Sequence, residues 1–350
     1  MKITFITNPL CLKHEMGFHP ESPDRLKAAL ELAKELSEAR KAELIEAEKA
    51  TRDDILLVHE PELYELIKKV SERGGGYLTP DNRANQYTFE ASLAAAGCTI
   101  KAAMLSLGRS SFSFSLCRPP GHHASFSRPA GFCFFNNIAI SAAKLLTASN
   151  TQDQPLAEKI AIIDIDQHFG DGTSDIFYES NEVLYVSLHA DPHFSYPGTG
   201  FLDEIGSGAG EGFNVCIPLP PRCTDSEYLL ALDEIALPVV SEFAPDTILV
   251  SAGFDGLFSD SVGHLGLTTF GYQTIADRIH ETAEHLKANI ASSLEGGYDV
   301  AKFKDCIKGH IAYYESKCRL QGNLGNESTL TTIKKTITYL KDILSPFWSL

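Results

Sequence analysis

The run DIDQH, residues 164–168, repeats side chains that could bind a metal at every second position. Asp164, Asp166 and His168 are spaced so that all three would lie on one face of an extended chain. Two carboxylates and an imidazole beside an apolar run would be costly to bury unless a cation compensated them. A lone Asp-x-His pair is more often a turn cap and a hydrogen-bonded histidine. The GDG that follows and the motifs below favour a divalent metal here.

Asp255, in the motif SAGFDG, is the natural third ligand. Asp166, His168 and Asp255 would form a three-ligand site with open positions for water and substrate, which is the arrangement of catalytic zinc. By itself, GFDG could be an ordinary turn that an Asx hydrogen bond stabilises. The assignment therefore depends on the other motifs.

The adjacent histidines of RPPGHHASF, residues 118–126, are interpreted as acid–base groups and not as ligands. If His122 and His123 both bound the metal, the site would be saturated. Beside an open metal they could move the protons of an activated water, and each would need a carboxylate to fix its tautomer. We predict that Asp164 and Asp171 are those partners. Two ordinary loop histidines in solvent are the alternative.

Tyr298 follows two glycines in LEGGYD, where the backbone can approach a ligand closely. Its hydroxyl could stabilise a developing oxyanion, and it would then complete a set of metal, base and electrophile. A tyrosine after Gly-Gly is more often a plain turn residue, so this hypothesis also depends on its neighbours.

Each of these motifs comes directly after a predicted β-strand. Strands are predicted at 2–6, 43–47, 112–117, 159–166, 182–188, 213–219, 246–252 and 291–297. Helices are predicted from Ser22-Pro23 onward and at 89–107, 229–243, 272–288 and 328–344. This alternation, with strands apolar on both faces, predicts a doubly wound α/β fold with a parallel sheet. Functional groups gather at the carboxyl ends of such strands, so we expect the motifs to meet in one domain, residues 1–350.

Composition excludes several classes of function. The formal charge of −16 disfavours binding to a nucleic-acid backbone, although an acidic surface is usually only a solubility feature. The eight cysteines contain no CxxC pair, so free thiols in a reducing compartment are expected in place of disulfides or a thiolate zinc site. No run approaches the ~18 apolar residues of a membrane span, and the N-terminus does not fit a signal peptide. We expect a soluble, cytoplasmic protein.

Five ordered motifs, RPPGHHA, DIDQHFGDG, SLHADPHFSYPGTG, SAGFDG and LEGGYD, resemble the zinc-dependent histone deacetylase superfamily. The resemblance runs from HPESPDR at residue 19 to at least Tyr298. HPESPDR, SAGFDG and LEGGYD look more like class II deacetylases and bacterial acetylpolyamine amidohydrolases than like class I. The resemblance implies an arginase-like α/β fold with an eight-stranded parallel sheet and helices on both faces. It also implies hydrolysis of an N-acetyl amide on a lysine or a polyamine.

The resemblance further implies roles for individual residues. One zinc ion per chain would be bound by Asp166, His168 and Asp255, and the catalytic residues would be His122, His123 and Tyr298, with Asp164 and Asp171 supporting the histidine pair. Substrate would contact Phe132 and Tyr196 as tunnel walls, together with Gly131, Leu265 near the tunnel mouth and Asp81 as a rim acid. A structural potassium ion would be bound by Asp164, Ser187 and Leu188, with backbone oxygens of Asp166 and His168.

Two positions depart from the family pattern. Phe169 stands where a second histidine usually follows the ligand histidine, which changes the surroundings of the site but removes no ligand. Tyr196 replaces the common phenylalanine of the tunnel wall and adds a hydroxyl. Tyr298, where the weakly active class IIa enzymes have histidine, argues for catalysis.

We expect a zinc-dependent amidohydrolase that removes acetyl or other acyl groups from lysine in peptides or proteins. His123 would take the proton of the attacking water and His122 would assist, in a division that the sequence leaves open. The alternative is an acetylpolyamine amidohydrolase. A binuclear manganese ureohydrolase is disfavoured because GFDG offers one aspartate, and a non-catalytic acyl-lysine binder because Tyr298 and the ligands are intact. A homo-oligomer would be unsurprising.

Overall fold

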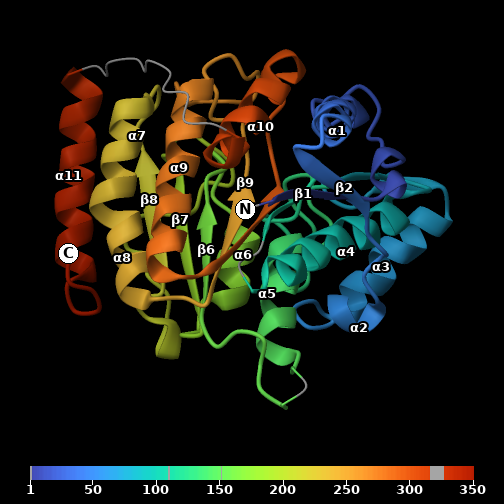
Figure 1. Cartoon of the computed structure of the whole chain (residues 1–350), viewed down its shortest axis with the longest axis horizontal. Coiled ribbons are helices and arrows are strands. Elements are labelled where there is room, and N and C mark those ends of the chain that lie inside the picture. Colours follow the sequence, from blue (N-terminus) through green and yellow to red (C-terminus); the bar gives the residue numbers. More distant parts are fainter. Residues whose placement is uncertain (1, 109–110, 151, 316–326) are drawn as a thin grey trace.

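A single eight-stranded sheet forms the centre of the molecule (Figure 1). The structure is a computed structural model that describes residues 2–108, 111–150, 152–315 and 327–350. The strands are β1 (Lys2–Thr7), β2 (Ala42–Glu46), β5 (Ser111–Ser115), β6 (Ile160–Asp164), β7 (Val183–Ala190), β8 (Asn214–Leu219), β9 (Thr247–Ala252) and β10 (Asn289–Leu294). They lie in the order β2-β1-β5-β10-β9-β6-β7-β8, and every neighbouring pair is parallel. The eight predicted strands and the predicted parallel sheet are therefore confirmed.

Helices cover both faces of this sheet (Figure 1). The longer ones are α1 (Pro23–Glu38), α3 (Pro61–Glu72), α4 (Thr88–Ser106), α5 (Asn137–Thr147), α9 (Thr269–Leu286), α10 (Val300–Glu315) and α11 (Glu327–Leu344), and the shorter ones are α2 (Arg52–Ile55), α6 (Asp171–Phe177), α7 (Asp225–Ala231) and α8 (Leu237–Phe243). Helices α1, α9 and α10 pack together on one face, α4 and α5 pack on the other, and α11 packs against α7 and β8 at one edge. The sequences of β6, β7 and β9 are near-continuous apolar runs, and these strands are buried along their whole length.

Two elements differ from the sequence-based expectation. The helix predicted at 229–243 is interrupted by a π-helical turn, Leu232–Ala236, between α7 and α8. Pro238 has no N–H to donate to the carbonyl four residues earlier, so the helix widens immediately before it. The segment 75–85, for which no strand is predicted from the sequence, contains an antiparallel hairpin of β3 (Gly75–Tyr77) and β4 (Arg83–Asn85). Helices α3, α5 and α10 were not individually predicted.

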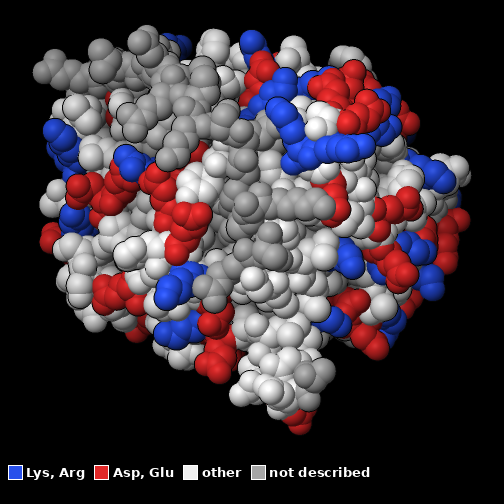
Figure 2. Space-filling model, viewed as in Figure 1, with Lys and Arg blue, Asp and Glu red and all other residues white. Residues whose placement is uncertain are grey.

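The surface and the thiols agree with simple expectations from composition. Acidic side chains are interspersed with basic ones over the face shown in Figure 2. The seven cysteines within the described ranges are buried and unpaired, and Cys318 lies outside those ranges. Among the described helices, none has the length and apolar character needed to span a bilayer.

The four central strands, β5, β10, β9 and β6, are neighbours in space although they are far apart in sequence. The chain proceeds from β1 to one edge of the sheet and from β6 through β7 to β8 at the other edge. Open α/β sheets bind ligands where the strand order reverses in this way, at the carboxyl ends of the central strands. The tandem histidines follow β5, DIDQH ends β6, Asp255 follows β9, and Tyr298 follows β10. The topology therefore brings all four motifs to one edge.

Candidate functional site

Three buried side chains face one another at the centre of this edge. His168 Nδ1 lies 3.1 Å from Asp166 Oδ1 and 3.1 Å from Asp255 Oδ2. One ligand atom from each residue lies within 4.8 Å of the other two, and all three residues are buried. Two carboxylates converging on one imidazole nitrogen, away from solvent, are the donor set of an open three-ligand zinc site. These residues therefore fit a divalent cation.

The local chain path differs from the one predicted for DIDQH. Strand β6 ends at Asp164, and the backbone N–H of Asp166 donates to Asp164 Oδ1 at 3.1 Å, so the chain turns immediately after the strand. The expectation that Asp164, Asp166 and His168 share one face of an extended strand is wrong. The turn separates Asp164, whose carboxylate faces His122, from the two residues that face Asp255.

A glycine allows the two carboxylates to approach each other. The N–H of Gly296 donates to Asp166 Oδ2 at 2.8 Å. A Cβ atom at this position would lie 2.1 Å from Asp255 Oδ2 and 2.5 Å from Asp166 Oδ2, so any side chain here would displace both acids. The first glycine of LEGGYD, Gly296, is thus required by the packing of the site.

Each of the tandem histidines is hydrogen-bonded to its own carboxylate. His122 Nδ1 lies 3.1 Å from Asp164 Oδ2, and His123 Nδ1 lies 2.7 Å from Asp171 Oδ1. Their ring centroids are 4.0 Å apart. In both residues Nδ1 is engaged, which leaves Nε2 as the nitrogen for chemistry. Gly131, at φ +51°, passes so close to His123 that a Cβ atom would lie 2.2 Å from the imidazole ring.

The charges around these imidazoles separate their pKa values. Burial alone would lower the pKa of His122, but the carboxylates of Asp166 and Asp164 raise it well above its usual value. Burial, together with the nearby charge of His122, lowers the pKa of His123 to about 4. Burial also opposes protonation of His168, yet Asp255 and Asp166 raise its pKa to about 10. Neighbouring groups with such divergent pKa values are typical of acid–base sites.

Tyr298 is held by its backbone and by the guanidinium of Arg25. The N–H of Tyr298 donates to Asp260 Oδ2 at 2.5 Å. The guanidinium carbon of Arg25 lies 4.8 Å from the centroid of the Tyr298 ring, and Arg25 Nε donates to the carbonyl of Gly297. Burial raises the pKa of Tyr298 well above its ordinary value, so the phenol keeps its proton and can donate a hydrogen bond.

Two aromatic rings line the approach to the site. Phe132 is 6.0 Å from the Tyr298 ring, centroid to centroid, and 4.5 Å from that of His19. Tyr196 is 5.0 Å from His123 by the same measure. The Tyr196 side chain is 43% exposed, so this wall extends from the buried histidines to solvent.

The remaining predicted substrate residues lie around this approach. Asp81 Oδ2 accepts a hydrogen bond from the N–H of Gly131 at 2.9 Å, so the two predicted residues are in direct contact. Leu265 lies in the same loop as Asp255, but its side chain is buried beside Gly256 and is not exposed at the entrance.

The residues predicted for potassium are neighbours across β6 and β7. Asp164 pairs with Ser187 in the strand register, and Leu188 is buried in the next position of β7. The hydroxyl of Tyr185 also donates to Asp164 Oδ2 at 2.9 Å.

A buried network of charged side chains was not predicted from the sequence. Glu21 accepts hydrogen bonds from both Arg25 and Arg118, and none of the three side chains is exposed. Burial alone would raise the pKa of Glu21, but Arg118 and Arg25 lower it to about 2. Glu295 was also missed, although its Oε2 accepts the backbone N–H of Gly121 at 2.6 Å. These charged residues lie inside the motifs HPESPDR, RPPGHHA and LEGGYD, but the motifs do not indicate which groups they contact.

Comparison with known proteins identifies the same family. Residues 19–314 match the histone deacetylase domain model. The chain is 41% identical over 294 residues to a probable deacetylase of Archaeoglobus fulgidus, covering 83% of this chain and 79% of the relative. It is 36% identical to histone deacetylase 15 of Arabidopsis thaliana over 94% of this chain, but spans only 59% of that plant protein. The crystal structure of the HDA15 HD domain superimposes with a TM-score of 0.86 at 30% identity, covering 99% of this chain and 95% of that one. The chain therefore belongs to the histone deacetylase family.

Proposed function

We propose that this protein is a zinc-dependent amidohydrolase that removes acetyl groups from the ε-amine of lysine in peptides or proteins. The observation that carries the proposal is the convergence of His168 Nδ1, Asp166 Oδ1 and Asp255 Oδ2 beside two histidines that each have a carboxylate partner. Family membership supports a deacetylase, and this donor set supports a metal-assisted one.

Asp166, His168 and Asp255 are the residues that would hold the zinc ion. When bound there, the zinc ion would supply Lewis-acid chemistry toward the amide carbonyl and would lower the pKa of a water toward ~7. His123 Nε2 then takes the proton of the attacking water, because Asp171 already engages Nδ1. We propose that His122 Nε2 supports the developing charge or protonates the leaving amine.

Tyr298 supplies the hydrogen bond to the oxyanion. Its phenol is protonated, and its position is held by Asp260 through the backbone and by Arg25 against the ring face. Such a preorganised donor stabilises charge that develops only in the transition state.

Exposed aromatic side chains that neighbour site residues in the sequence are our reason for proposing a peptide, and not a polyamine, as substrate. Three exposed phenyl groups, Phe18, Phe194 and Phe258, each lie within two residues of a site contact. Phe18 adjoins His19, which packs on Phe132, and Phe194 is in the loop of Tyr196. Phe258 precedes Ser259, whose hydroxyl donates to Asp299 beside Tyr298. Exposed aromatic rings beside a site suit apolar side chains that flank a lysine in a peptide.

A comparative hydrolysis assay tests this function. Zinc-loaded protein is given an acetyl-lysine peptide, acetylated spermidine and putrescine, and longer acyl-lysine peptides, and free acid release is measured with and without a chelator. We expect chelator-sensitive turnover with the acetyl-lysine peptide to exceed that with the polyamines. Preferential cleavage of acetylspermidine would assign the polyamine alternative, and absence of turnover with every substrate would refute the amidohydrolase.

A structural potassium ion is proposed at Asp164, Ser187 and Leu188, joined by backbone oxygens of Asp166 and His168. The pairing of Asp164 with Ser187 and the burial of both support it. A higher thermal unfolding temperature in potassium chloride than in lithium chloride of equal ionic strength is the expected result. Equal unfolding temperatures in the two salts would contradict it.

A further inference from the structure

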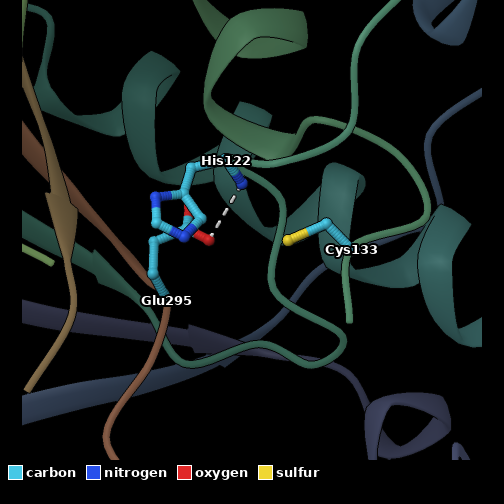
Figure 3. Close-up of side chains that lie close together, drawn as sticks. All are labelled: His122, Cys133 and Glu295. Atoms are coloured by element: carbon cyan, nitrogen blue, oxygen red, sulfur yellow. Dashed lines mark hydrogen bonds between the residues drawn. The ribbon is translucent and has the colours of Figure 1, made fainter. Parts of the chain in front are cut away.

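A second group of metal-binding side chains lies beside the one described above. His122, Cys133 and Glu295 are all buried, and one ligand atom from each lies within 4.8 Å of the other two. Figure 3 shows the three side chains pointing toward a common point. His122 and Cys133 come from the connection between β5 and α5, and Glu295 is the residue after β10. No CxxC spacing in the sequence indicates such a site, because Glu295 is distant in sequence from the other two residues.

Each of the three side chains keeps a ligand atom for a metal. Glu295 Oε2 accepts the backbone N–H groups of Gly121 at 2.6 Å and His122 at 3.2 Å, whereas Glu295 Oε1 is buried with no hydrogen-bond partner. An unpartnered buried carboxylate oxygen is costly, which is itself a reason to look for a cation. His122 Nδ1 is engaged by Asp164, so Nε2 is the nitrogen left for a metal.

The donor set differs from that of the first site. Thiolate, imidazole and carboxylate are all zinc ligands, and the sulfur makes this group the softer of the two. The thiol of Cys133 donates to the carbonyl of Gly131, with Sγ 3.4 Å from that oxygen, and Glu295 Oε2 is already held by two backbone N–H groups. A metal must break the hydrogen bond of the thiol before the sulfur can bind it, so its affinity here is expected to be lower than at Asp166, His168 and Asp255.

We propose that His122, Cys133 and Glu295 form a second, weaker zinc site whose occupation inhibits the enzyme. A zinc ion on His122 Nε2 removes the nitrogen that the proposed mechanism needs for proton transfer. The two sites adjoin, because His122 Nε2 lies 4.0 Å from Asp166 Oδ2. Binding at the second site stands on the geometry alone, while the inhibitory effect rests on the proposed function.

Cobalt provides a probe that distinguishes the two sites. Only the second site contains sulfur, so only its occupation produces a thiolate-to-cobalt charge-transfer band in the near ultraviolet. Titration of the metal-depleted protein with Co²⁺ should first give visible ligand-field absorption and then, at higher concentration, the sulfur band. In Cys133→Ser the sulfur band should be lost and the ligand-field absorption of the first equivalent kept. Cys306→Ser, which changes a buried thiol in α10, should behave like the unaltered protein.

Zinc stoichiometry and activity complete the test. By equilibrium dialysis, excess zinc should load two ions per chain in the unaltered protein and one in Cys133→Ser. Excess zinc should also inhibit acetyl-lysine hydrolysis by the unaltered protein but not by Cys133→Ser. A sulfur band that never forms, or a second zinc ion that survives in Cys133→Ser, would overturn the site. If no variant hydrolyses any substrate, the proposed function fails, but the band and the stoichiometry still decide whether the second site exists.

Discussion

Two groups of buried histidines in this molecule have opposite surroundings. His122, His123 and His168 lie at the carboxyl edge of the sheet among carboxylates. His280 and His310 lie between the sheet and helices α9 and α10, where aromatic rings such as Phe112 surround them. Burial lowers the pKa of an imidazole in both places. It leaves His310 at a pKa of about 3, whereas carboxylates reverse the effect for His168 and raise its pKa to about 10.

This contrast separates packing from chemistry. His280 of α9 and His310 of α10 pack against aromatic rings, and His310 Nε2 forms a 2.9 Å hydrogen bond with the Ser292 hydroxyl. The histidines at the carboxyl edge are surrounded by more buried charge than packing requires, and burying an isolated charge costs free energy. The proposed metal ion and substrate would compensate such a concentration of charge. The number of buried carboxylates around an imidazole, and not its burial, is therefore the feature that marks the site.

Among the substitutions that test this contrast, Asp255→Asn should have the largest effect on zinc binding and turnover. This substitution removes one of the two carboxylates that face His168 and one metal ligand. Loss of residues that merely support a ligand weakens metal affinity about 10- to 100-fold, so loss of the ligand itself should exceed ~100-fold. Zinc bound after dialysis against a competing chelator, and acetyl-lysine hydrolysis, should both be lost.

His310→Gln is the matched control from the other group. It alters a buried histidine that has no carboxylate partner among its described contacts, so zinc content and turnover should stay at the level of the unaltered protein. If Asp255→Asn retained its zinc, or if His310→Gln lost it, the distinction between the two groups would be contradicted.

Tyr298→Phe should give the next largest effect, and only on the rate. The ring contacts with Phe132 and Arg25 remain, so folding and zinc content should be unchanged. Loss of an oxyanion donor typically costs on the order of 100-fold or more in kcat. Steady-state kinetics with an acetyl-lysine peptide should show lower kcat at similar KM. Turnover equal to that of the unaltered protein would exclude the oxyanion role.

The candidate metal ligands could be predicted from the sequence, whereas the turn and the buried charges that hold them in position could not. Asp166, His168 and Asp255 were predicted together because each carboxyl end of a parallel strand reaches the same edge. The turn after Asp164 was not predicted. It depends on the hydrogen bond that the Asp164 carboxylate accepts from the N–H of Asp166, and the periodicity of a strand gives no indication of such a bond. Glu295 was missed because its partners are backbone N–H groups from a loop distant in sequence.

The same limit applies to the fold. Strands with continuous apolar runs were recognisable because both faces of the sheet are covered. The β3–β4 hairpin was not, because Gly75 and Gly76 carry no side-chain pattern. At Gly75, a Cβ atom would lie 2.4 Å from the carbonyl oxygen of Ala84 on the partner strand. The requirement for glycine there is tertiary, so it is visible only once the strands are paired.

The smallest predicted effect is on the pH dependence of the free energy of unfolding, and it concerns the neutral histidine His310. The folded-state pKa of His310 is about 3, and that of an unfolded histidine is about 6.5. Between these values the unfolded chain binds a proton that the folded chain does not, so stability is full above about pH 6.5 and falls as the pH is lowered. The contribution of one such histidine is about 1.4 kcal/mol per pH unit.

Urea unfolding between about pH 7 and about pH 5 should therefore show a shallower pH dependence in His310→Phe than in the unaltered protein. Because the measured quantity is the slope, a change in absolute stability from the lost Ser292 bond does not affect the comparison. His285→Gln, at an exposed position of α9, should keep the original slope, and an equal slope in all three proteins would show that His310 is not held neutral by burial.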